Sequence, residues 1–152
     1  MLNSRGTAVA DFWHRGVLDI AVAASTDQHA LLRNDISPNR NWLVVKLIGA
    51  AGELAQGTNR DAVGARVSVY ANGIQQTREV VLGDGYASQS TLHLHFGLDQ
   101  AEQVDEMIVR WPRSGMVQRF AHITANRYYE LQEGQEQLVE KSYGTRRHGR
   151  SE

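Results

Sequence analysis

The chain has 152 residues, with 16 Lys and Arg against 17 Asp and Glu and a formal net charge of −1. This is the size of a single domain with an appendage, and the mixed charges form no basic face for the phosphates of a nucleic acid. The chain has no cysteine, which excludes a disulfide framework and thiolate metal sites.

The first 35 residues carry apolar side chains that need a partner surface. Burying such side chains is worth about 1.5–3 kcal/mol each, and an exposed apolar strand offers an unpaired edge to other chains. We therefore expect residues 1–35 to pack on the rest of the chain, or to form a homodimer by strand exchange. The side chains concerned are Val9, Phe12, Leu18, Ile20, Val22 and Leu31.

A buried strand and a long loop follow. Trp42–Ile48 is apolar on both sides apart from Lys46, which is typical of a central strand covered on both faces. The segment Gly49–Arg60 is rich in Gly, Ala, Gln and Asn and has no sustained period. It predicts a loop, and its length makes it a candidate for binding.

The rest of the chain alternates with a period of two residues, as strands do. Ala65–Ala71 leads into Asn72-Gly73, which predicts a hairpin with a two-residue turn. Only Gln100–Asp105 looks helical, over one or two turns. The sequence therefore predicts an all-β fold, an antiparallel β-sandwich or small β-barrel of about 8–10 strands. Further strands are expected at 92–96, 107–111, 116–121 and 128–132, with a turn at 112–115.

The two ends of the chain carry no anchor signal. Residues 1–6 lack the basic-then-apolar pattern of a signal peptide, and no apolar run approaches the ~20 residues of a membrane span. We expect no membrane insertion, and the sequence leaves the compartment open. The tail, residues 141–152, has no apolar side chain beyond Tyr143, so we expect it to be flexible and solvated.

Three blocks between Asn59 and Gly115, the last of them in two parts, resemble the ASPIC/UnbV module, the C-terminal domain of cartilage acidic protein and of many bacterial secreted proteins. In that family Arg-Asp-Gly-x-Gly-Ala-Arg-Val, Ser-Gln-Ser, His-Phe-Gly-Leu and Trp-Pro-Ser-Gly recur in this order. This chain carries Asn59–Val67, Ser88–Ser90, His95–Leu98 and Trp111–Gly115, with Ala62 where a glycine is usual and Arg113 inserted. The resemblance covers about residues 39–133. It implies an extracellular or envelope setting and a binding role.

The N-terminal segment resembles the end of an FG-GAP (VCBS-like) repeat, a blade of a β-propeller that usually precedes this module. We therefore divide the chain into repeat strands at 1–38, the module at 39–140 and the tail at 141–152. The resemblance implies a calcium loop at Asp11–Asp19. Only the first and last carboxylates remain there, and Arg15 stands at a ligand position. We expect no calcium at this loop and no other cofactor.

Two histidines offer a metal-dependent alternative. His93 and His95 lie on one face of a predicted strand, a spacing that metal sites in small β-barrels also use. The competing interpretation gives His95 a structural hydrogen bond and turns His93 to solvent. Ser88 and Ser90 lack the elbow of a nucleophilic serine, so we expect no catalytic residue.

Charged and planar side chains in the best-matched blocks either pin the long loop to the sheet through ion pairs or line a site for a polar ligand such as a sugar. The ligand-binding candidates are Asn59, Arg60, Arg66, Arg78, Tyr86 and Gln89. Two classes of function follow. The first is a non-catalytic module that binds carbohydrate or protein at the cell surface. The alternative is a metal-dependent β-barrel enzyme that uses His93 and His95.

Overall fold

A computed structural model describes residues 3–26, 28–35 and 39–142 of the chain. The strands are β1 (Ser4–Ala10), β2 (Asp19–Ala24), β3 (Ala30–Leu32), β4 (Asn41–Ile48), β5 (Arg66–Ala71), β6 (Ile74–Glu79), β7 (Leu94–Asp99), β8 (Gln103–Arg110), β9 (Val117–Thr124), β10 (Arg127–Gln132) and β11 (Val139–Lys141). Within these described ranges there is no helix, so none is long and apolar enough to span a membrane.

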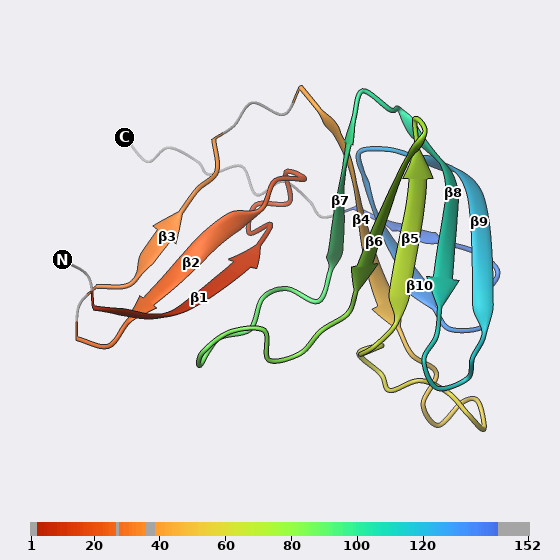
Figure 1. Cartoon of the computed structure of the whole chain (residues 1–152), viewed down its shortest axis with the longest axis horizontal. Coiled ribbons are helices and arrows are strands. Elements are labelled where there is room, and N and C mark those ends of the chain that lie inside the picture. Colours follow the sequence, from red (N-terminus) through yellow and green to blue (C-terminus); the bar gives the residue numbers. More distant parts are fainter. Residues whose placement is uncertain (1–2, 27, 36–38, 143–152) are drawn as a thin grey trace.

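Two four-stranded sheets form a sandwich (Figure 1). Their strand orders are β11-β10-β4-β7 and β6-β5-β8-β9, and all neighbours are antiparallel except β10 and β4. The third sheet, β1-β2-β3, stands beside the sandwich and joins neither of its sheets (Figure 1). The predicted all-β fold is confirmed, as a sandwich and not as a closed barrel.

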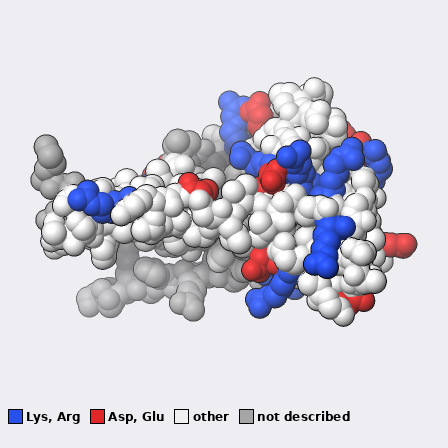
Figure 2. All heavy atoms as spheres, turned by 60° about the horizontal axis from the view of Figure 1, so that its bottom comes forward, with Lys and Arg blue, Asp and Glu red and all other residues white. Residues whose placement is uncertain are grey.

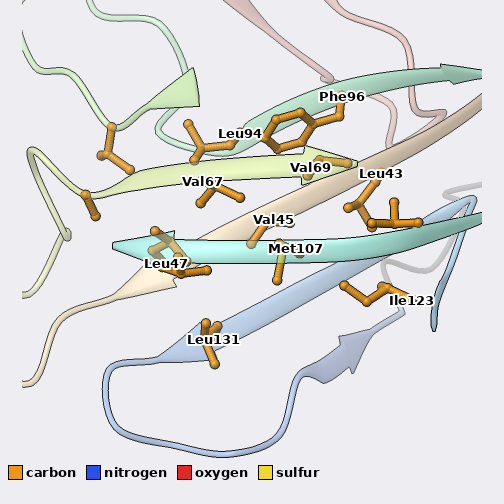
Figure 3. Close-up of a cluster of buried hydrophobic side chains, with 14 of the residues drawn as sticks. Leu43, Val45, Leu47, Val67, Val69, Leu94, Phe96, Met107, Ile123 and Leu131 are labelled. Atoms are coloured by element: carbon orange, nitrogen blue, oxygen red, sulfur yellow. The ribbon is translucent and has the colours of Figure 1, made fainter. Parts of the chain in front are cut away.

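The core lies between the two sheets and is filled by alternate residues of each strand. On β4, Leu43, Val45 and Leu47 point inward and are at most 4% exposed. They meet Val67, Val69 and Met107 from the opposite sheet, with Phe96 and Leu131 beside them (Figure 3). Because successive side chains of a strand point to opposite faces, the other residues of β4 must face away from this core.

The predicted hairpin at Asn72-Gly73 is confirmed. It joins β5 to β6, and both turn residues have positive φ, 48° and 73°. The predicted helix at Gln100–Asp105 is wrong. There the chain makes a short turn after β7, closed by the Ala101 N–H to the Leu98 carbonyl at 3.0 Å. Strand β8 then begins at Gln103, because alternation places Val104, which is fully buried, in the core.

One buried carboxylate ties three segments of the module together. Glu133 follows β10 and is 2% exposed. It accepts hydrogen bonds from the Ala50 N–H at 3.0 Å, from the Thr58 N–H at 2.7 Å and hydroxyl at 2.9 Å, and from the Ser114 hydroxyl at 2.6 Å. The long loop after β4 and the turn before β9 are thus fixed to the end of β10.

The sheet β1-β2-β3 touches the module along one edge and is apolar on both faces. Val9 of β1 accepts the Thr91 N–H at 2.9 Å and donates its own N–H to the Ser90 hydroxyl at 3.3 Å. Leu31 and Leu32 lie on opposite faces and are 51% and 54% exposed. Figure 2 shows few charged side chains over this sheet compared with the sandwich. The homodimer expected through residues 1–35 stays a prediction, which light scattering showing a monomer would exclude.

Candidate functional site

The candidate site is built on the outer face of the sheet β11-β10-β4-β7. Val44 of β4 points away from the core, and its neighbours across the sheet are His95 on β7 and Tyr128 on β10. Paired residues of adjacent strands share a face, so these three side chains form one row across the sheet. Trp42 and His93 lie on the same face, two residues away from Val44 and His95 respectively.

The loop between β1 and β2 closes over this row. The Asp11 carboxylate accepts the N–H of Arg15 at 2.9 Å and of Gly16 at 2.5 Å, which bends the loop into a tight turn. The Tyr128 hydroxyl donates to the same carboxylate. His95 Nε2 lies 2.5 Å from the Gly16 carbonyl oxygen. Since a carbonyl only accepts, His95 must carry its proton on Nε2.

Aromatic packing completes the junction. The Trp42 indole stacks on the His95 ring, with centroids 6.5 Å apart and planes 15° apart. Tyr128 meets Trp42 edge-on at 5.1 Å and His14 at 5.6 Å. Gly16 lies against Trp42 so closely that a Cβ would stand 2.0 Å from Cε2. The N-terminal loop is therefore seated on the sheet by direct ring-to-backbone contact.

A cavity of about 270 Å³ lies between the seated loop and the sheet. Both parts of the molecule contribute walls, and most of the surface inside is apolar. The lining residues are Ala10, Asp11, Phe12, His14, Leu18, Val44, Thr91, His93, His95 and Tyr128. The cavity therefore exists only where the N-terminal segment and the module meet.

The pKa of each of the two module histidines is lowered in this environment. Burial lowers the pKa of His93, and Lys46 and His14 nearby lower it further, against an opposing effect of Glu130. Burial also lowers the pKa of His95 and outweighs the hydrogen bond to Gly16. The structural hydrogen bond expected for His95 is confirmed. His93, in contrast, lines the cavity and is half-buried.

We expect the seating of the N-terminal loop to weaken in mild acid. A histidine whose pKa is lowered in the seated state contributes fully above its ordinary value of about 6.5. Below that pH the unseated state takes up protons that the seated state resists, so stability is lost as pH falls toward the lowered values. Trypsin cleavage at Arg15, divided by cleavage of a short unstructured arginine peptide at the same pH, should therefore rise as pH falls below about 6.5. The control is the variant His93→Asn, whose cleavage should depend less on pH than that of the parent protein. If cleavage of the variant and the parent depends on pH equally steeply, His93 does not cause the weakening.

The donors of the loop from Asp11 to Asp19 do not fit a calcium ion. Asp19 is fully buried, and its Oδ1 is 2.9 Å from Nη2 of Arg15. The same Nη2 lies 3.2 Å from the Asn34 carbonyl oxygen. The Asp11 carboxylate already accepts hydrogen bonds from two backbone N–H groups. A guanidinium group thus stands beside Asp19, and the expected absence of calcium from this loop stays a prediction.

The metal alternative gains no support from the geometry. Within residues 3–26, 28–35 and 39–142, no three His, Asp or Glu side chains are grouped so that they could hold a metal ion. His93 and His95 do share a cavity, but the Nε2 of His95 is committed to the Gly16 carbonyl. A transition-metal site needs at least three converging ligands.

The arginines among the predicted ligand-binding residues have separate partners. Arg66 Nε pairs with Glu79 Oε2 at 2.6 Å across the β5–β6 hairpin. Arg78 covers Phe96 at the open edge of the sandwich, with its guanidinium carbon 5.8 Å from the ring centroid. The Arg60 side chain is 90% exposed in the long loop, and its Nε lies 3.9 Å from Oδ1 of Asp61.

The other three predicted residues lie in loops. Asn59 closes a turn with Val63, whose N–H it accepts at 3.0 Å. Gln89 bridges its own loop, accepting the Gly83 N–H at 2.6 Å. Tyr86 is 76% exposed. None of the six predicted residues lines the cavity under the N-terminal loop, and their role in binding stays a prediction.

Sequence patterns missed the N-terminal half of the site. From the sequence alone, Phe12 and His14 belong to a blade strand and a degenerate calcium loop, and Tyr128 belongs to a strand. One signal was available: Trp42–Ile48 is apolar on both sides, which predicts a cover on each face. The structure shows that the cover on the outer face includes the loop from Asp11 to Leu18.

Fold and site together define an all-β sandwich protein with a cavity at the junction of its two parts. The sequence profile of the family described as ASPIC and UnbV matches residues 55–138, more than half of the 152 residues. The chain belongs to the ASPIC and UnbV family. No curated protein matches the chain. The matched segment contains β5 to β10, so His93, His95 and Tyr128 lie inside it, whereas Asp11 and Val44 lie outside.

Proposed function

We propose that the chain is a non-catalytic binding module that takes a neutral sugar ring into the cavity under the N-terminal loop. The observation that carries the proposal is the composition of that cavity. Apolar walls from Phe12, Leu18 and Val44 face two neutral imidazoles and the Thr91 side chain. Ligand sites generally combine such apolar walls with a few polar groups that set orientation.

A sugar matches these walls in its chemistry. A pyranose ring has an apolar C–H face and a rim of hydroxyl groups. Phe12 is 45% exposed, so its ring can receive the apolar face. A neutral imidazole such as that of His93 offers one donor and one acceptor, which suits hydroxyl groups. The volume of about 270 Å³ is just below the usual range of about 300–1,000 Å³ for ligand pockets, which suits one small ring.

The absence of catalysis is part of the proposal. Asp11 is the carboxylate in the lining, and its oxygens accept hydrogen bonds from Arg15, Gly16 and Tyr128. Glycoside hydrolysis needs two carboxyl groups on either side of the bond that breaks. The lining of this cavity offers one carboxylate, already occupied, so it supports binding and not turnover.

The setting follows the family. Membership of the ASPIC and UnbV family supports an extracellular or cell-envelope location, where glycans are abundant. A protein ligand at the cell surface is the other partner expected from the sequence. The small volume of the cavity favours a single ring over a protein surface.

A glycan array followed by calorimetric titration tests the proposal. We expect Phe12→Ala and His93→Ala each to weaken binding of the captured sugar by about tenfold, which corresponds to about 1.4 kcal/mol. Tyr86→Ala is the matched control, because Tyr86 is an exposed aromatic residue that does not line the cavity. Loss of binding in Tyr86→Ala alone would move the site to the six residues predicted from the sequence. Failure of every neutral sugar to bind would refute the proposed function.

A further inference from the structure

The outer face of the sheet continues beyond the cavity. Along β4 the outward residues are Val44, Lys46 and Ile48, and along β10 their direct neighbours are Tyr128, Glu130 and Gln132. Strands rise about 3.3 Å per residue, so the third pair lies about 13 Å from the first. One surface therefore runs from the cavity toward the end of β10.

The middle of this surface is an ion-paired cluster. Glu130 accepts Lys46 Nζ at 2.9 Å on one oxygen and Lys141 Nζ at 2.8 Å on the other. The hydrogen bonds from Lys141 and Lys46 hold the pKa of Glu130 below its ordinary value. Because these charges are paired with one another, the middle of the face does not select a highly charged ligand.

The far end of the surface is a groove rich in amide groups. It has a volume of about 700 Å³ and is mainly polar. Primary amides carry donors and acceptors together, so three glutamines in one groove match a ligand rich in hydroxyl groups. The lining residues are Ile48, Glu130, Gln132, Gly134, Gln135, Glu136, Gln137, Val139 and Lys141.

We propose that the ligand is a neutral oligosaccharide chain, with one terminal ring in the cavity and the following rings laid along β4 and β10 into the glutamine groove. This inference rests on the proposed function, because the cavity supplies the anchoring ring. It adds a second binding surface, and it makes the ligand an oligosaccharide chain in place of a single sugar. The amides of Gln135 and Gln137 are the residues assigned to the distal rings.

The groove is unsuited to the other common polymers. The charged residues in its lining are Glu130, Glu136 and Lys141, a net of one negative charge. A polyanion would meet no excess of positive charge. An apolar peptide would have to bury the amide side chains without partners, which costs free energy for each unpaired group. A neutral oligosaccharide needs no excess of positive charge, and its hydroxyl groups can pair with the amide side chains.

Chain-length dependence tests this inference. The probes are neutral oligosaccharides built on glucose, xylose, mannose and galactose, each from the monosaccharide to the hexasaccharide, titrated into the full chain. For the series that binds, we expect affinity to rise at least about tenfold with length. In the double variant Gln135→Ala, Gln137→Ala the gain with length should vanish, while binding of the shortest sugar is retained. The matched control is Gln75→Ala on β6, an exposed glutamine on the opposite sheet, which should keep the full gain.

The outcomes separate the two proposals. Affinity that does not change with length, or a gain that survives in the double variant, overturns the oligosaccharide groove and leaves the sugar cavity standing. Capture of acidic polysaccharides only, with binding lost in salt, overturns the assignment of a neutral ligand. If no sugar of any length binds, the cavity proposal fails and the groove proposal fails with it.

Discussion

Replacing Glu133 by alanine is expected to cost about 4 kcal/mol of the free energy of unfolding. The carboxylate is buried and accepts the N–H groups of Ala50 and Thr58 and the hydroxyl groups of Thr58 and Ser114. Each buried donor left without a partner costs about 1–3 kcal/mol. Urea unfolding followed by circular dichroism measures the loss. The control is Glu136→Ala at an exposed position nearby, which should change the free energy of unfolding by less than about 0.5 kcal/mol.

The same carboxylate predicts a pH dependence. Burial by itself raises the pKa of Glu133, but the hydrogen bonds from Ser114, Ala50 and Thr58 outweigh it and hold the pKa below the ordinary 4.5. A lowered pKa contributes stability above the ordinary value and loses it as pH falls toward the lowered one. Glu133→Gln should be less stable than the parent near neutrality and should lose less stability below about pH 4.5. A destabilisation below about 1 kcal/mol in Glu133→Ala would show that the three segments are held by other contacts.

Replacing Gly16 by alanine is expected to unseat the N-terminal loop without unfolding the sandwich. Gly16 has φ of 76°, and an added Cβ would stand 2.0 Å from Cε2 of Trp42. The indole cannot move aside without losing its stacking on His95 and its contact with Tyr128. The Gly16–His95 hydrogen bond must then break, and the cavity loses one wall.

Cleavage by trypsin after Arg15 measures this change. The Arg15 side chain is 25% exposed in the seated loop, and cleavage reports the population of the open form. We expect Gly16→Ala to be cut about tenfold faster or more, with little change in the melting temperature of the sandwich. Gly97→Ala is the control, since a Cβ there meets no atom within 4 Å. Equal cleavage of Gly16→Ala and the parent would show that the loop is seated by other contacts.

Local signals in the sequence predicted the hairpins well. The β5–β6 turn depends on two adjacent residues that tolerate positive φ, and alternation in the flanking segments requires no knowledge of distant partners. The prediction of a helix at Gln100–Asp105 was wrong because a contact with a distant strand decides the conformation there. Its composition permits a helical turn, but burial of Val104 against the opposite sheet decides the local conformation in favour of a strand.

Long-range contacts account for what the sequence did not predict. Tyr128 and Asp11 are separated by 117 positions, and Glu133 and Thr58 by 75. Neither pairing has a local pattern, because the backbone brings these residues together only after the sheets form. His93 and His95 were found because both lie on one strand with alternate spacing. The residues that complete their cavity come from β4, β10 and the N-terminal loop.

The position of β4 bears on how members of this family should be divided for study. Residues 55–138 carry the recognisable signature, yet β4 ends at Ile48 and lies between β10 and β7 in its sheet. A polypeptide cut to the signature would leave both of those strands with open edges and remove Leu43, Val45 and Leu47 from the core. Such a polypeptide would aggregate through the exposed strand edges. The smallest self-sufficient piece of the module begins at or before Asn41. The proposed ligand cavity also needs the loop between β1 and β2, so a piece meant for binding experiments should begin with β1.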